Sequence, residues 1–576
     1  MPEDPRAGIK PRVEIEGTAL ASELETLIEQ VVVDDHLHLP DMFLLVFRDL
    51  EHQVTKQAKL QIGSKVKVSV PSPSGGGGPE LLIQGEVTSL EAEYDSLGSR
   101  AVVRGYDPSH RLHRGRVTQT YQNVKDSDIA QTIAGRAGLQ AGTIDDSQTT
   151  HDHVSQANQS DWDFLNARAD EIGFEVAVSE GKLHFRKPVA SQQAPGQGNF
   201  QTSDPLQLVM GQDLLEFRPR LSSSEQVKDV KVRGWDPKAK QAVIGSANAG
   251  TTSVQLHATP ADLAQKFGGP TYTATEHPLS TQREVDITAK AVAEQIGSVI
   301  GEAEGWARGN PKLKAGAAVS VSAVAEDFSG RYTLTHTRHV FDAHAGYRTK
   351  IEVSGRQDRS LLGLVVNGAV PASASGHPIY GVVVAQVTNN DDPEKLGRVK
   401  LKFPWLSDSY ESDWARMMQL SAGPDSGAVF MPEVNDEVLV AFEMGDVRRP
   451  IVVGGLYNGK DKPRLGDGLF DNGKVKRRGI VSRKGHRFIF FDDPGKSGIA
   501  LLTSDSAIKV SLNETKKQIH IVCKGKVVIE TEDDVSIKSS KKVSIEAGTD
   551  LELKGKQSKL SGDTVTVSGS QSIKLN

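Results

Sequence analysis

The most regular alternation of apolar and polar positions lies near the C-terminal end of the chain. From Ile519 onward, pairs of apolar residues two positions apart begin every eight residues, with Gly, Ser, Asp and Lys between them. A spacing of two is that of a β-strand with one buried face, and the intervening residue types favour turns. The pattern therefore predicts a row of short, equal strands. The pairs are Ile519 and Ile521, Val527 and Ile529, Val535 and Ile537, Val543 and Ile545, Leu551 and Leu553, and, after an interruption near Gly555 and Gly562, Val565 and Val567, and Ile573 and Leu575.

One eight-residue unit is a strand and a tight turn, which makes one side of a triangular layer. A single chain cannot bury the apolar face of such units, whereas three chains can enclose it around a common axis. We therefore predict an intertwined trimeric β-helix or β-prism over 479–576, whose closure leaves no long free strand edge. The paired residues from Ile519 to Val567 would form the core at the trimer axis, and Lys538, Lys541 and Lys542 would face water. The alternative is an up-and-down antiparallel sheet, in which strands rarely keep one length.

The first part of the chain has patterns typical of strands, interrupted by two helical stretches. Strands are predicted at 12–16, 43–48, 64–70, 80–90 and 100–104, and again at 174–178 and 182–186. Helices are predicted over 127–138 and 160–173, each closed by a glycine. The second opens with a capping box formed by Ser160 and Asp163. Residues 188–205 are rich in Gln, Ser, Gly and Pro and predict a loop.

Two sequence features of this part return later in the chain. The segment Val102-Val-Arg-Gly-Tyr-Asp-Pro108 has a similar counterpart in Val230-Lys-Val-Arg-Gly-Trp-Asp-Pro237. The valines that follow Gly63 likewise have counterparts after Gly316. A helix is again predicted, at 281–296, closed by Gly297. We therefore predict two related β-barrel-like domains, 1–225 with a helical insertion and 226–370. A trimer would then present six similar domains, although chance similarity of strand ends remains the alternative.

Residues 377–458 predict a separate, small closed barrel of the OB type. Five short strands with glycine turns, at 380–387, 398–403, 415–420, 437–442 and 451–454, suit such a barrel. Its aromatic residues, including Phe403 and Trp405, are interspersed with acidic residues such as Asp408 and Glu411. Acidic side chains oppose the binding of phosphate groups, so we expect no nucleic-acid partner. Residues 459–478 then form a linker to the shaft.

Composition narrows the class of protein further. The chain has 576 residues, which is enough for several domains, and a net charge of −6. Its one cysteine, Cys523, has the same strand parity as Ile519 and Ile521, so we expect a buried shaft position rather than a catalytic or metal-binding one. No apolar signal sequence or membrane-spanning run is evident. We expect synthesis and assembly in the cytoplasm, with any export carried out by a larger machine.

Candidate catalytic and metal-binding residues are few. The Gly75–Gly78 run lacks the lysine of a phosphate-binding loop. The pairs His36/His38 and His151/His153 could each share one face of a strand, but a third metal ligand is not evident, so surface histidines are expected. Asp391-Asp392 and Asp492-Asp493 lie beside proline or glycine and predict turns. We therefore predict a non-enzymatic protein with no cofactor and no metal.

Several motifs resemble the central spike proteins of contractile injection machines. This family comprises VgrG proteins of type VI secretion, the hub-and-spike proteins of contractile phages, and the spikes of extracellular contractile injection systems. Leu396-Gly-Arg-Val-Lys-Leu-Lys-Phe-Pro-Trp405 resembles its barrel signature, with Gly397, Arg398, Val399, Phe403 and Trp405. Gly427–Asp446 and Arg449–Asn458 also resemble the barrel, and Val103–Leu112 and Ser160–Leu165 the hub. The segment from His36 to Phe43 is more similar to phage-type and extracellular systems.

The resemblance implies a homotrimer at the centre of a baseplate. Its hub would receive the ring of inner tube protein among other baseplate proteins, and sheath contraction would drive its shaft through a target cell envelope. The final strand, with Ile573, Leu575 and Asn576, would expose its end in a trimer, and the resemblance implies a PAAR-like tip protein there. Some phage relatives carry a lysozyme domain between barrel and shaft, for which 459–478 is too short. A trimeric, tailspike-like carbohydrate-binding protein is the alternative, but aromatic residues nearly vanish after Phe491.

Overall fold

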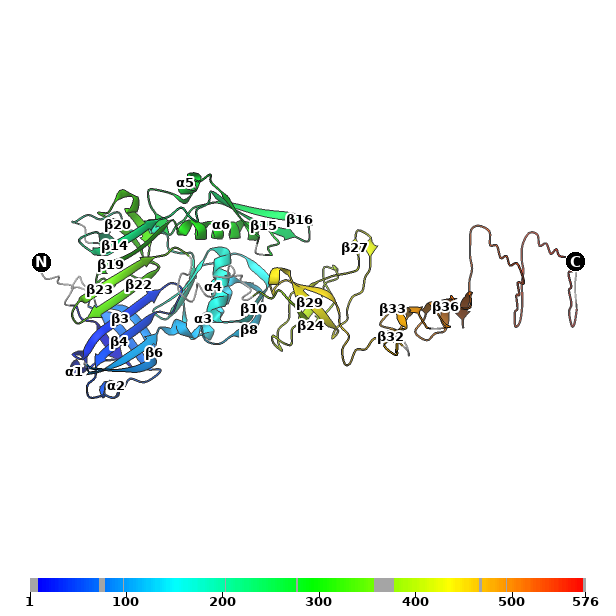
Figure 1. Cartoon of the computed structure of the whole chain (residues 1–576), viewed down its shortest axis with the longest axis horizontal. Helices are drawn as coiled ribbons and strands as arrows, with labels where there is room; N and C mark the ends of the chain where they lie inside the picture. The colour runs from blue at the N-terminus through cyan, green and yellow to red at the C-terminus, as the bar shows by residue number, and fades with distance from the viewer. Residues whose placement is uncertain are drawn as a thin grey trace. The chain divides into compact units, whose positions relative to one another are not determined.

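The computed structural model describes residues 9–71, 78–96, 98–201, 204–275, 278–356, 378–465, 469–493 and 495–572. Within these residues the chain is mainly β-structure with a few helices (Figure 1), which confirms the predicted fold class. It divides into two compact units, Met1–Asn458 and Gly459–Asn576, each of which is described by itself.

The first unit is built on an eleven-stranded, half-barrel sheet of order β14-β19-β23-β22-β3-β4-β7-β6-β5-β1-β2. Strands from both predicted hub domains join in it, because β22 pairs antiparallel with β3, from His336 opposite His36 to Asp342 opposite Gln30. The sequence does not predict this connection. The strands are β1 (Arg12–Ile15), β2 (Thr18–Ala19), β3 (Ile28–His36), β4 (Met42–Arg48), β5 (Lys65–Val70), β6 (Glu80–Asp95), β7 (Gly98–Tyr106), β14 (Leu214–Leu221), β19 (Gly301–Arg308), β22 (His336–Asp342) and β23 (Gly346–Val353).

Two hydrophobic cores bury one face of this sheet. The first includes Phe43 and Leu45 of β4 and extends to Leu24 and Val54, which lie on the short helices α1 (Ser22–Glu25) and α2 (Val54–Gln57). The second includes Ile351 of β23 and is shared with a four-stranded sheet. The elements of that region are β13 (Gln207–Val209), β17 (Val254–Gln255), β20 (Ala318–Ser322), β21 (Gly330–Thr333), η2 (Ser191–Gln193) and η3 (Glu326–Phe328).

A third core joins helices α3 (Asp126–Arg136) and α4 (Asp161–Ile172) to neighbouring strands. The Ser160 half of the predicted capping box is present, since its hydroxyl accepts a hydrogen bond from the Asp163 N–H at 3.1 Å. Gly173 closes α4 with a left-handed φ of 71°. Helix α3 begins one residue before the predicted range of 127–138, because Lys125 takes the N-cap position. The neighbouring elements are η1 (Pro108–Arg111), β8 (Val117–Lys125), β9 (Gln140–Ile144), β10 (Thr150–Gln159), β11 (Glu175–Ser179) and β12 (Lys182–Arg186).

Helix α6 (Gln282–Ser298) packs on a three-stranded sheet, and Thr281, the first residue of the predicted helix, is its N-cap. The prediction that Gly297 closes this helix is wrong, because Gly297 lies inside it. A Cβ atom at Gly297 would stand 2.3 Å from the carbonyl oxygen of Gly250, so the glycine is needed for close backbone packing. The sheet and its surroundings consist of β15 (Asp229–Asp236), β16 (Gln241–Asn248), β18 (Thr271–Ala274) and α5 (Pro260–Gln265).

The repeated Asp-Pro motif folds locally in the same way at both places. Asp107 accepts a hydrogen bond from the Ser109 N–H at 3.2 Å, and Asp236 accepts one from the Lys238 N–H at 2.8 Å. Both side chains therefore stabilise the turn that follows their strand. The wider surroundings differ, because β7 lies in the eleven-stranded sheet and β15 in the three-stranded sheet. The boundaries of the two hub domains stay a prediction.

The region predicted as an OB barrel is a five-stranded sheet of order β25-β24-β29-β30-β26. It closes on itself next to β25 and β26, where Val399 and Ala415 exchange backbone hydrogen bonds of 3.0 and 2.7 Å. The elements are β24 (Val382–Asn389), β25 (Lys400–Lys402), β26 (Arg416–Met417), β27 (Ala422–Gly423), β28 (Ser426–Gly427), β29 (Glu437–Phe442), η4 (Glu443–Gly445) and β30 (Pro450–Gly455).

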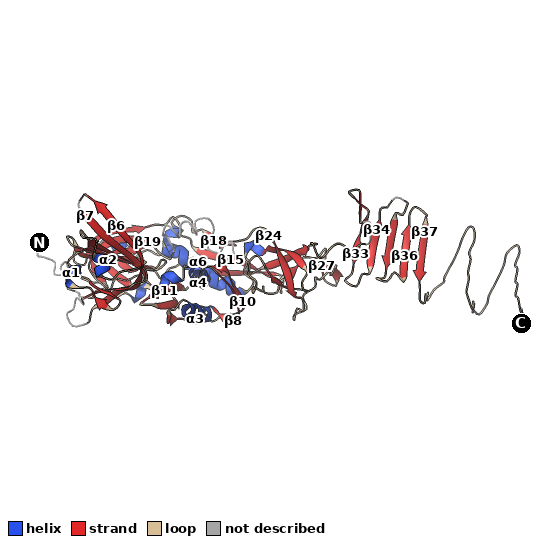
Figure 2. Cartoon of the chain, turned by 90° about the horizontal axis from the view of Figure 1, so that it is seen from below, coloured by secondary structure: helices blue, strands red, loops and turns tan. Residues whose placement is uncertain are grey.

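The second unit contains a five-stranded antiparallel sheet in which each strand pairs with the next along the chain (Figure 2). Over 477–523 this is the up-and-down arrangement considered as the alternative to the prism. Of the eight-residue repeats, the pair of Ile519 and Ile521 lies in it, whereas the described residues after Cys523 contain no assigned strand in the single chain. The strands are β31 (Phe470–Asp471), β32 (Lys474–Val475), β33 (Arg477–Val481), β34 (Arg487–Phe491), β35 (Gly498–Leu502), β36 (Ile508–Asn513) and β37 (Gln518–Cys523).

Candidate functional site

The residues of the predicted barrel signature organise the loop and edge around β25. Gly397 takes a left-handed φ of 71°, and Val399 and Phe403 are fully buried in the barrel core. Arg398 donates two hydrogen bonds to Asp392, at 2.6 and 3.0 Å, and these hold the pKa of Asp392 below its usual range. Trp405 stays half-exposed and donates from its indole N–H to the Val384 carbonyl oxygen at 3.2 Å. The signature is thus mainly structural.

A chain of alternating charges joins the hub helices to the barrel. Arg168 of α4 donates to Asp126 of α3 at 2.7 Å and forms an ion pair with Glu171. Arg448, between η4 and β30, donates to Glu171 at 3.0 Å and to Asp446 at 2.8 Å. Burial alone would raise the pKa of Asp126 and of Asp446, but the neighbouring arginines hold both below the usual range. The sequence did not reveal this hub–barrel joint, because its members lie far apart in the chain.

The two predicted surface histidines on β10 belong to the same joint, so that prediction is wrong. His151 lies 3.0 Å from Asp126, and His153 donates from Nε2 to the carbonyl oxygen of Glu411 in the barrel at 3.0 Å. Burial lowers the pKa of His153 from its usual value. His36 and His38 are also half-buried. Among the described residues, no three His, Cys, Asp or Glu side chains gather in an arrangement that could hold a metal ion.

Three carboxyl groups gather where β3, β4 and η1 meet. Burial raises the pKa of Asp35 and of Asp107 to about 6, and that of Asp41 well above its usual value. Repulsion between the three carboxylates contributes to the shifts of Asp41 and Asp107. Their hydrogen bonds go to backbone groups nearby, such as the N–H of His36 and that of Ala315. The cluster therefore holds the start of β4 in place and introduces a pH dependence of stability.

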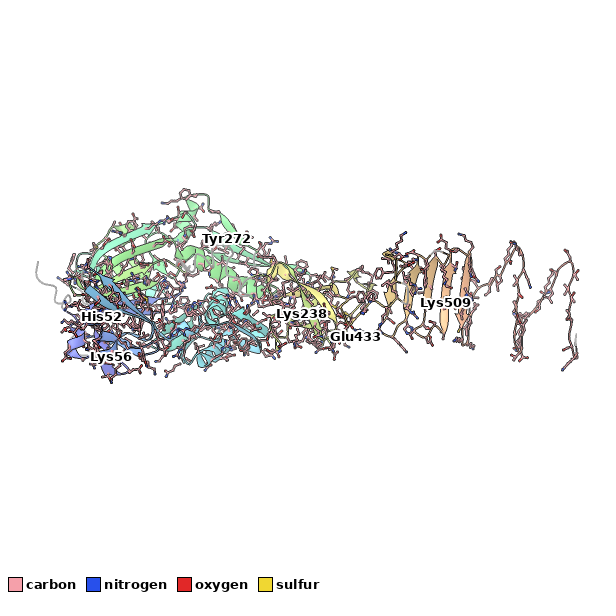
Figure 3. The ribbon with its side chains drawn as sticks, turned by 60° about the horizontal axis from the view of Figure 1, so that its bottom comes forward. His52, Lys56, Lys238, Tyr272, Glu433 and Lys509 are labelled. Atoms are coloured by element: carbon pink, nitrogen blue, oxygen red, sulfur yellow. The ribbon has the colours of Figure 1, made fainter. Side chains whose placement is uncertain are left out.

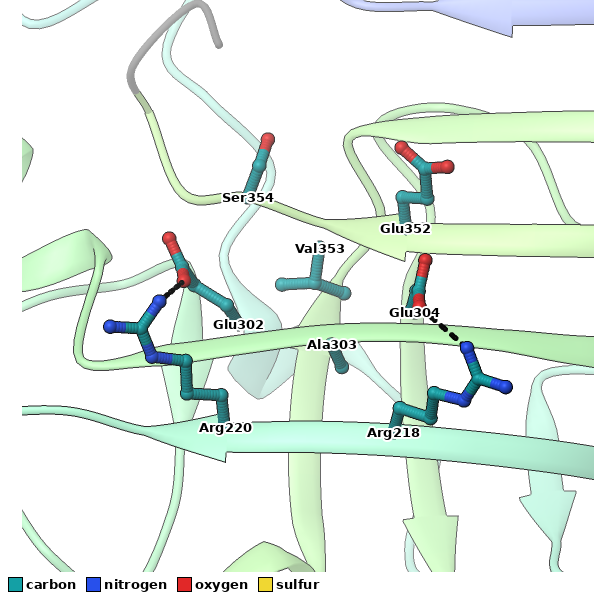
Figure 4. A pocket seen from close by; sticks show the side chains of 8 residues that line it. All are labelled: Arg218, Arg220, Glu302, Ala303, Glu304, Glu352, Val353 and Ser354. Atoms are coloured by element: carbon teal, nitrogen blue, oxygen red, sulfur yellow. Dashed lines mark hydrogen bonds and ion pairs between the residues drawn. The ribbon is translucent and has the colours of Figure 1, made fainter.

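Two shallow grooves lie on the eleven-stranded sheet. The first, of about 280 Å³, crosses β14, β19 and β23, and its arginines pair with its glutamates, Arg218 with Glu304 and Arg220 with Glu302 (Figure 4). The second, of about 430 Å³, crosses β3, β4 and β22 and holds Arg338 paired with Asp34 at 2.6 Å. Charges held in such pairs stabilise the sheet surface rather than activate a nucleophile.

One face of the sheet in the second unit is apolar across all five strands. In the single chain these side chains are open to solvent, with exposed fractions of 53% for Leu501 and 63% for Ile521. The opposite face is mixed, because it carries Lys509 (Figure 3) but also Ile489 and Ala500, each 2% exposed. Monomeric proteins rarely expose an apolar surface of this extent, so this apolar face is the strongest candidate interface. The cross-strand register places on it Ile480, Phe488, Phe490, Ile499, Leu501, Ile508, Val510, Leu512, Ile519, Ile521 and Cys523.

The predicted axial core of the shaft is not buried in the single chain. All twelve predicted core residues are exposed, with exposed fractions from 51% for Val543 to 78% for Ile529. The physical reason is that one chain supplies only one apolar face to each layer, and nothing in the same chain covers it. Their burial at a trimer axis stays a prediction. The exposed residues are Ile519, Ile521, Val527, Ile529, Val535, Ile537, Val543, Ile545, Leu551, Leu553, Val565 and Val567.

Three further expectations concern the shaft and its end. Cys523, expected at a buried position, is only half-buried in the single chain. The predicted tip-binding residues Ile573, Leu575 and Asn576 lie outside the described residues. Within the described part of the chain, no helix is both long and apolar enough to cross a bilayer.

Two protein-family models match the chain. The model described as the Alg8 N-terminal domain covers residues 12–342, more than half of the chain, and includes every strand of the eleven-stranded sheet except β23. The model described as the type VI secretion system/phage-baseplate injector OB domain covers residues 383–457, which form the closed barrel.

The chain is also similar to individual spike proteins of type VI secretion. The type VI secretion system spike protein VgrG2a of Pseudomonas aeruginosa is 33% identical over 90 residues, 15% of this chain and 11% of the relative. VgrG3 of Vibrio cholerae is 29% identical over 137 residues, 23% of this chain and 12% of the relative, so the chain spans only about a tenth of these relatives.

Among solved structures, the half-lidded Francisella PdpA–VgrG complex is similar in fold, with a TM-score of 0.51 at 11% identity over 89% of this chain and 88% of that chain. The chain belongs to the Alg8 N-terminal domain family, and over the matched residues it is VgrG-like in sequence.

Proposed function

We propose that this chain is the structural spike and baseplate hub of a phage-tail-like contractile injection machine, and that it works as a homotrimer. The matched relatives are named spike proteins of type VI secretion, and the barrel matches an injector OB domain. The order of hub, barrel and repeat shaft along the chain supports the same role. In this role the protein binds partners and transmits force, and it performs no catalysis.

The exposed apolar face of 477–523 carries this proposal. A sheet that exposes an apolar face of this extent is stable in water only when that face is covered. Three copies of the sheet around one axis would cover all three apolar faces at once. The eight-residue repeats continue the same parity to Val567, so the same axis would run through the predicted axial residues. The trimer therefore explains both the sheet and the repeat.

The hub would connect this three-fold object to a six-fold one. Each chain carries the Asp-Pro motif twice, with the same local hydrogen bond at Asp107 and Asp236. A trimer thus presents six related positions to the ring of inner tube protein, and other baseplate proteins surround it. The hub–barrel joint would transmit force from the tube to the shaft when the sheath contracts.

The shaft would point at the target envelope and pierce it. Three chain ends, each with Ile573, Leu575 and Asn576, would form a surface for a PAAR-like tip protein, one copy per trimer. The particle would assemble in the cytoplasm and act at or beyond the envelope, with cargo travelling on the same spike.

Two adjacent residues on β36 allow a matched test of the trimer. Val510 lies on the apolar face and Ser511 on the opposite face of the same strand. Val510→Asp would place three charges in the covered core and should abolish the trimer, whereas Ser511→Asp should leave it intact. Sedimentation velocity gives the mass of each variant. Trimers of equal yield from both variants would contradict the proposed interface.

A further inference from the structure

The eight-residue repeats of the shaft carry charged residues at two fixed positions. We count the first apolar residue of each repeat as position 1, so that position 4 directly follows the second apolar residue and position 8 directly precedes the next repeat. In both rows the sign of the charge alternates over four successive repeats. The position-4 row holds Glu530, Lys538, Glu546 and Lys554, and the position-8 row holds Lys526, Asp534, Lys542 and Asp550.

Both rows point away from the predicted shaft axis. Each charged position is next in sequence to an apolar one, and successive side chains of an extended strand lie on opposite faces. All eight side chains are exposed in the single chain. Of the eight, only Lys554 has an ion pair within the described residues, with Glu552 at 2.6 Å. The charges of the rows are therefore available to other copies of the chain.

The path of the chain leaves space for other copies between its turns. Figures 1 and 2 are perpendicular views, and in both the chain after Cys523 swings from side to side as it advances. It therefore winds, and within the described residues 525–572 its turns share no backbone hydrogen bonds. The backbone N–H and C=O groups of these turns need partners, which strands of other copies would supply.

A three-fold shaft brings opposite charges of different copies together. The same repeat of all three copies lies at one height, so successive layers on one side of the shaft come from different copies. All copies run in the same direction, which makes neighbouring strands parallel and puts equal positions of successive repeats about 4.8 Å apart. Glu530 of one copy then lies beside Lys538 of another copy. The same holds for Asp534 and Lys542 in the position-8 row.

The apolar pairs alone do not fix this register. Val535 and Ile537 in one repeat are the same residue types as Val543 and Ile545 in the next, so a slip by one whole repeat would keep a core of Val and Ile. In each row, however, such a slip would bring like charges of different copies side by side. Like charges directly opposite each other on neighbouring strands destabilise a sheet.

We propose that the two charge rows form lines of ion pairs between copies and select the register in which equal repeats lie at one height. This inference rests on the homotrimer proposed above. An internal member of a row, such as Lys538, then has an opposite charge from another copy on each side along the shaft. The charge rows thus specify which layer packs on which, while the apolar pairs supply the core that all layers share.

Paired cysteines test the register directly in the full chain. With Cys523→Ala as background, Glu530→Cys is combined with Lys538→Cys, which the proposed register brings within the range of about 4.4–6.8 Å between Cα atoms that a disulfide needs. We expect covalent dimers and trimers on a non-reducing denaturing gel, reversed by reductant. Glu530→Cys with Glu546→Cys is the matched control. These positions lie two layers apart, at about 9.6 Å, and should give single chains.

A second set of variants tests whether charge selects the register. In the chain with cysteines at 530 and 538, Lys542→Asp makes three successive members of the position-8 row acidic. We expect the yield of cross-linked chains to fall by about two-fold or more. Inverting the whole row restores the alternation and should restore the yield. The inverted chain carries Lys526→Asp, Asp534→Lys, Lys542→Asp and Asp550→Lys.

The outcomes separate the charge rows from the trimer itself. A native trimer whose 530/538 cysteine pair gives only single chains on the gel would overturn the proposed register and leave the proposed function standing. Cross-linking of the 530/546 control as strongly as the 530/538 pair would also overturn it, because it would reveal a slipped shaft. An unchanged yield with Lys542→Asp, or no recovery in the inverted row, would overturn the role of charge. A native mass of one chain would overturn both proposals together.

Discussion

The two units of this chain solve the problem of burying apolar side chains in different ways. In the first unit Leu401 of the barrel is fully buried, as are Phe43 and Leu45 of the hub sheet. In the second unit Leu501, which lies in strand β35, is 53% exposed. The hub and barrel thus complete their cores within one chain, whereas the shaft sheet leaves its apolar face for other chains.

This difference has a thermodynamic consequence. Covering a side chain such as Leu contributes about 1.5–3 kcal/mol relative to leaving it in water. The first unit gains this energy on folding alone, so its stability should not depend on protein concentration. The second unit would gain it on association, so its stability should rise with concentration. Substitutions in each unit test this difference between the two units.

The largest effect is expected at an axial shaft position. Ile537→Asp would bury three unpaired charges in one layer, so we expect it to prevent shaft assembly. Lys541→Asp lies between two predicted strands, at a position expected to face water, and should assemble like the parent chain. Native mass spectrometry of both variants measures the trimer fraction, and equal fractions would contradict the assigned register.

The next largest effect is expected at the hub–barrel joint. Arg448→Ala leaves Glu171 and Asp446 without their shared cation, and losing one partner of a buried pair typically costs about 3–5 kcal/mol. We expect about 3 kcal/mol, because the Arg448 side chain keeps 22% exposure. Urea unfolding of the first unit measures the loss. Lys238→Ala, at the exposed pair with Glu394, is the control and should cost less than about 1 kcal/mol.

A pair of leucine truncations compares the two units directly. Leu401→Ala should cost about 2–5 kcal/mol, because it opens a cavity in a core that one chain completes. Leu501→Ala should destabilise only the assembled shaft. In the Ile537→Asp background, urea unfolding should therefore show the full loss for Leu401→Ala and almost none for Leu501→Ala. Similar losses for both in that background would mean that the shaft sheet has its own core.

The smallest effect concerns pH and the acidic cluster of the hub. The pKa of Asp107 is raised to about 6, so the folded state keeps a proton that the unfolded state releases near pH 4. The stability contributed by this proton is present below pH 4 and is lost as the pH rises to 6. Asp107→Asn keeps the turn and removes this titration. The fall in unfolding free energy between pH 4 and 6 should then be smaller by about 1–3 kcal/mol. An unchanged slope between pH 4 and 6 would rule out the proposed burial.

Local patterns of the sequence predicted many elements well. Alternation with period two located β29 at Glu437–Phe442, and the Ser160 and Gly173 signals located both ends of α4. These features depend on residues close together in the chain. Gly297 shows the limit of such signals. A glycine is needed there because the backbone of Gly250 lies close to it, and not because a helix ends there.

Strand pairs and side-chain contacts between distant parts of the chain could not be predicted from the sequence. The β22–β3 pairing and the contact of Arg448 with Glu171 join residues that are distant in the chain, and no local pattern specifies them. The histidines of β10 illustrate the same point, since their spacing shows that they share a face but not that the face meets Asp126 and Glu411. The shared face of Ile519 and Ile521 was predicted, and the up-and-down pairing of their strand was the alternative that the pattern left open.

The repeats after Cys523 show where a prediction from pattern depends on other chains. The period of eight locates Ile529 and Ile545 on one face, but both are exposed in the single chain, at 78% and 64%. The pattern predicts which face of each repeat is apolar, but it does not predict which molecule covers that face. Burial of these residues therefore has to be measured in the assembled protein.

The mass of the wild-type chain in solution tests the central claim most directly. Sedimentation equilibrium over a hundred-fold range of concentration should give three times the mass of one chain throughout, because the apolar shaft face is covered only in the trimer. A single-chain mass at every concentration, with the β-sheet signal of the shaft retained in circular dichroism, would contradict the account.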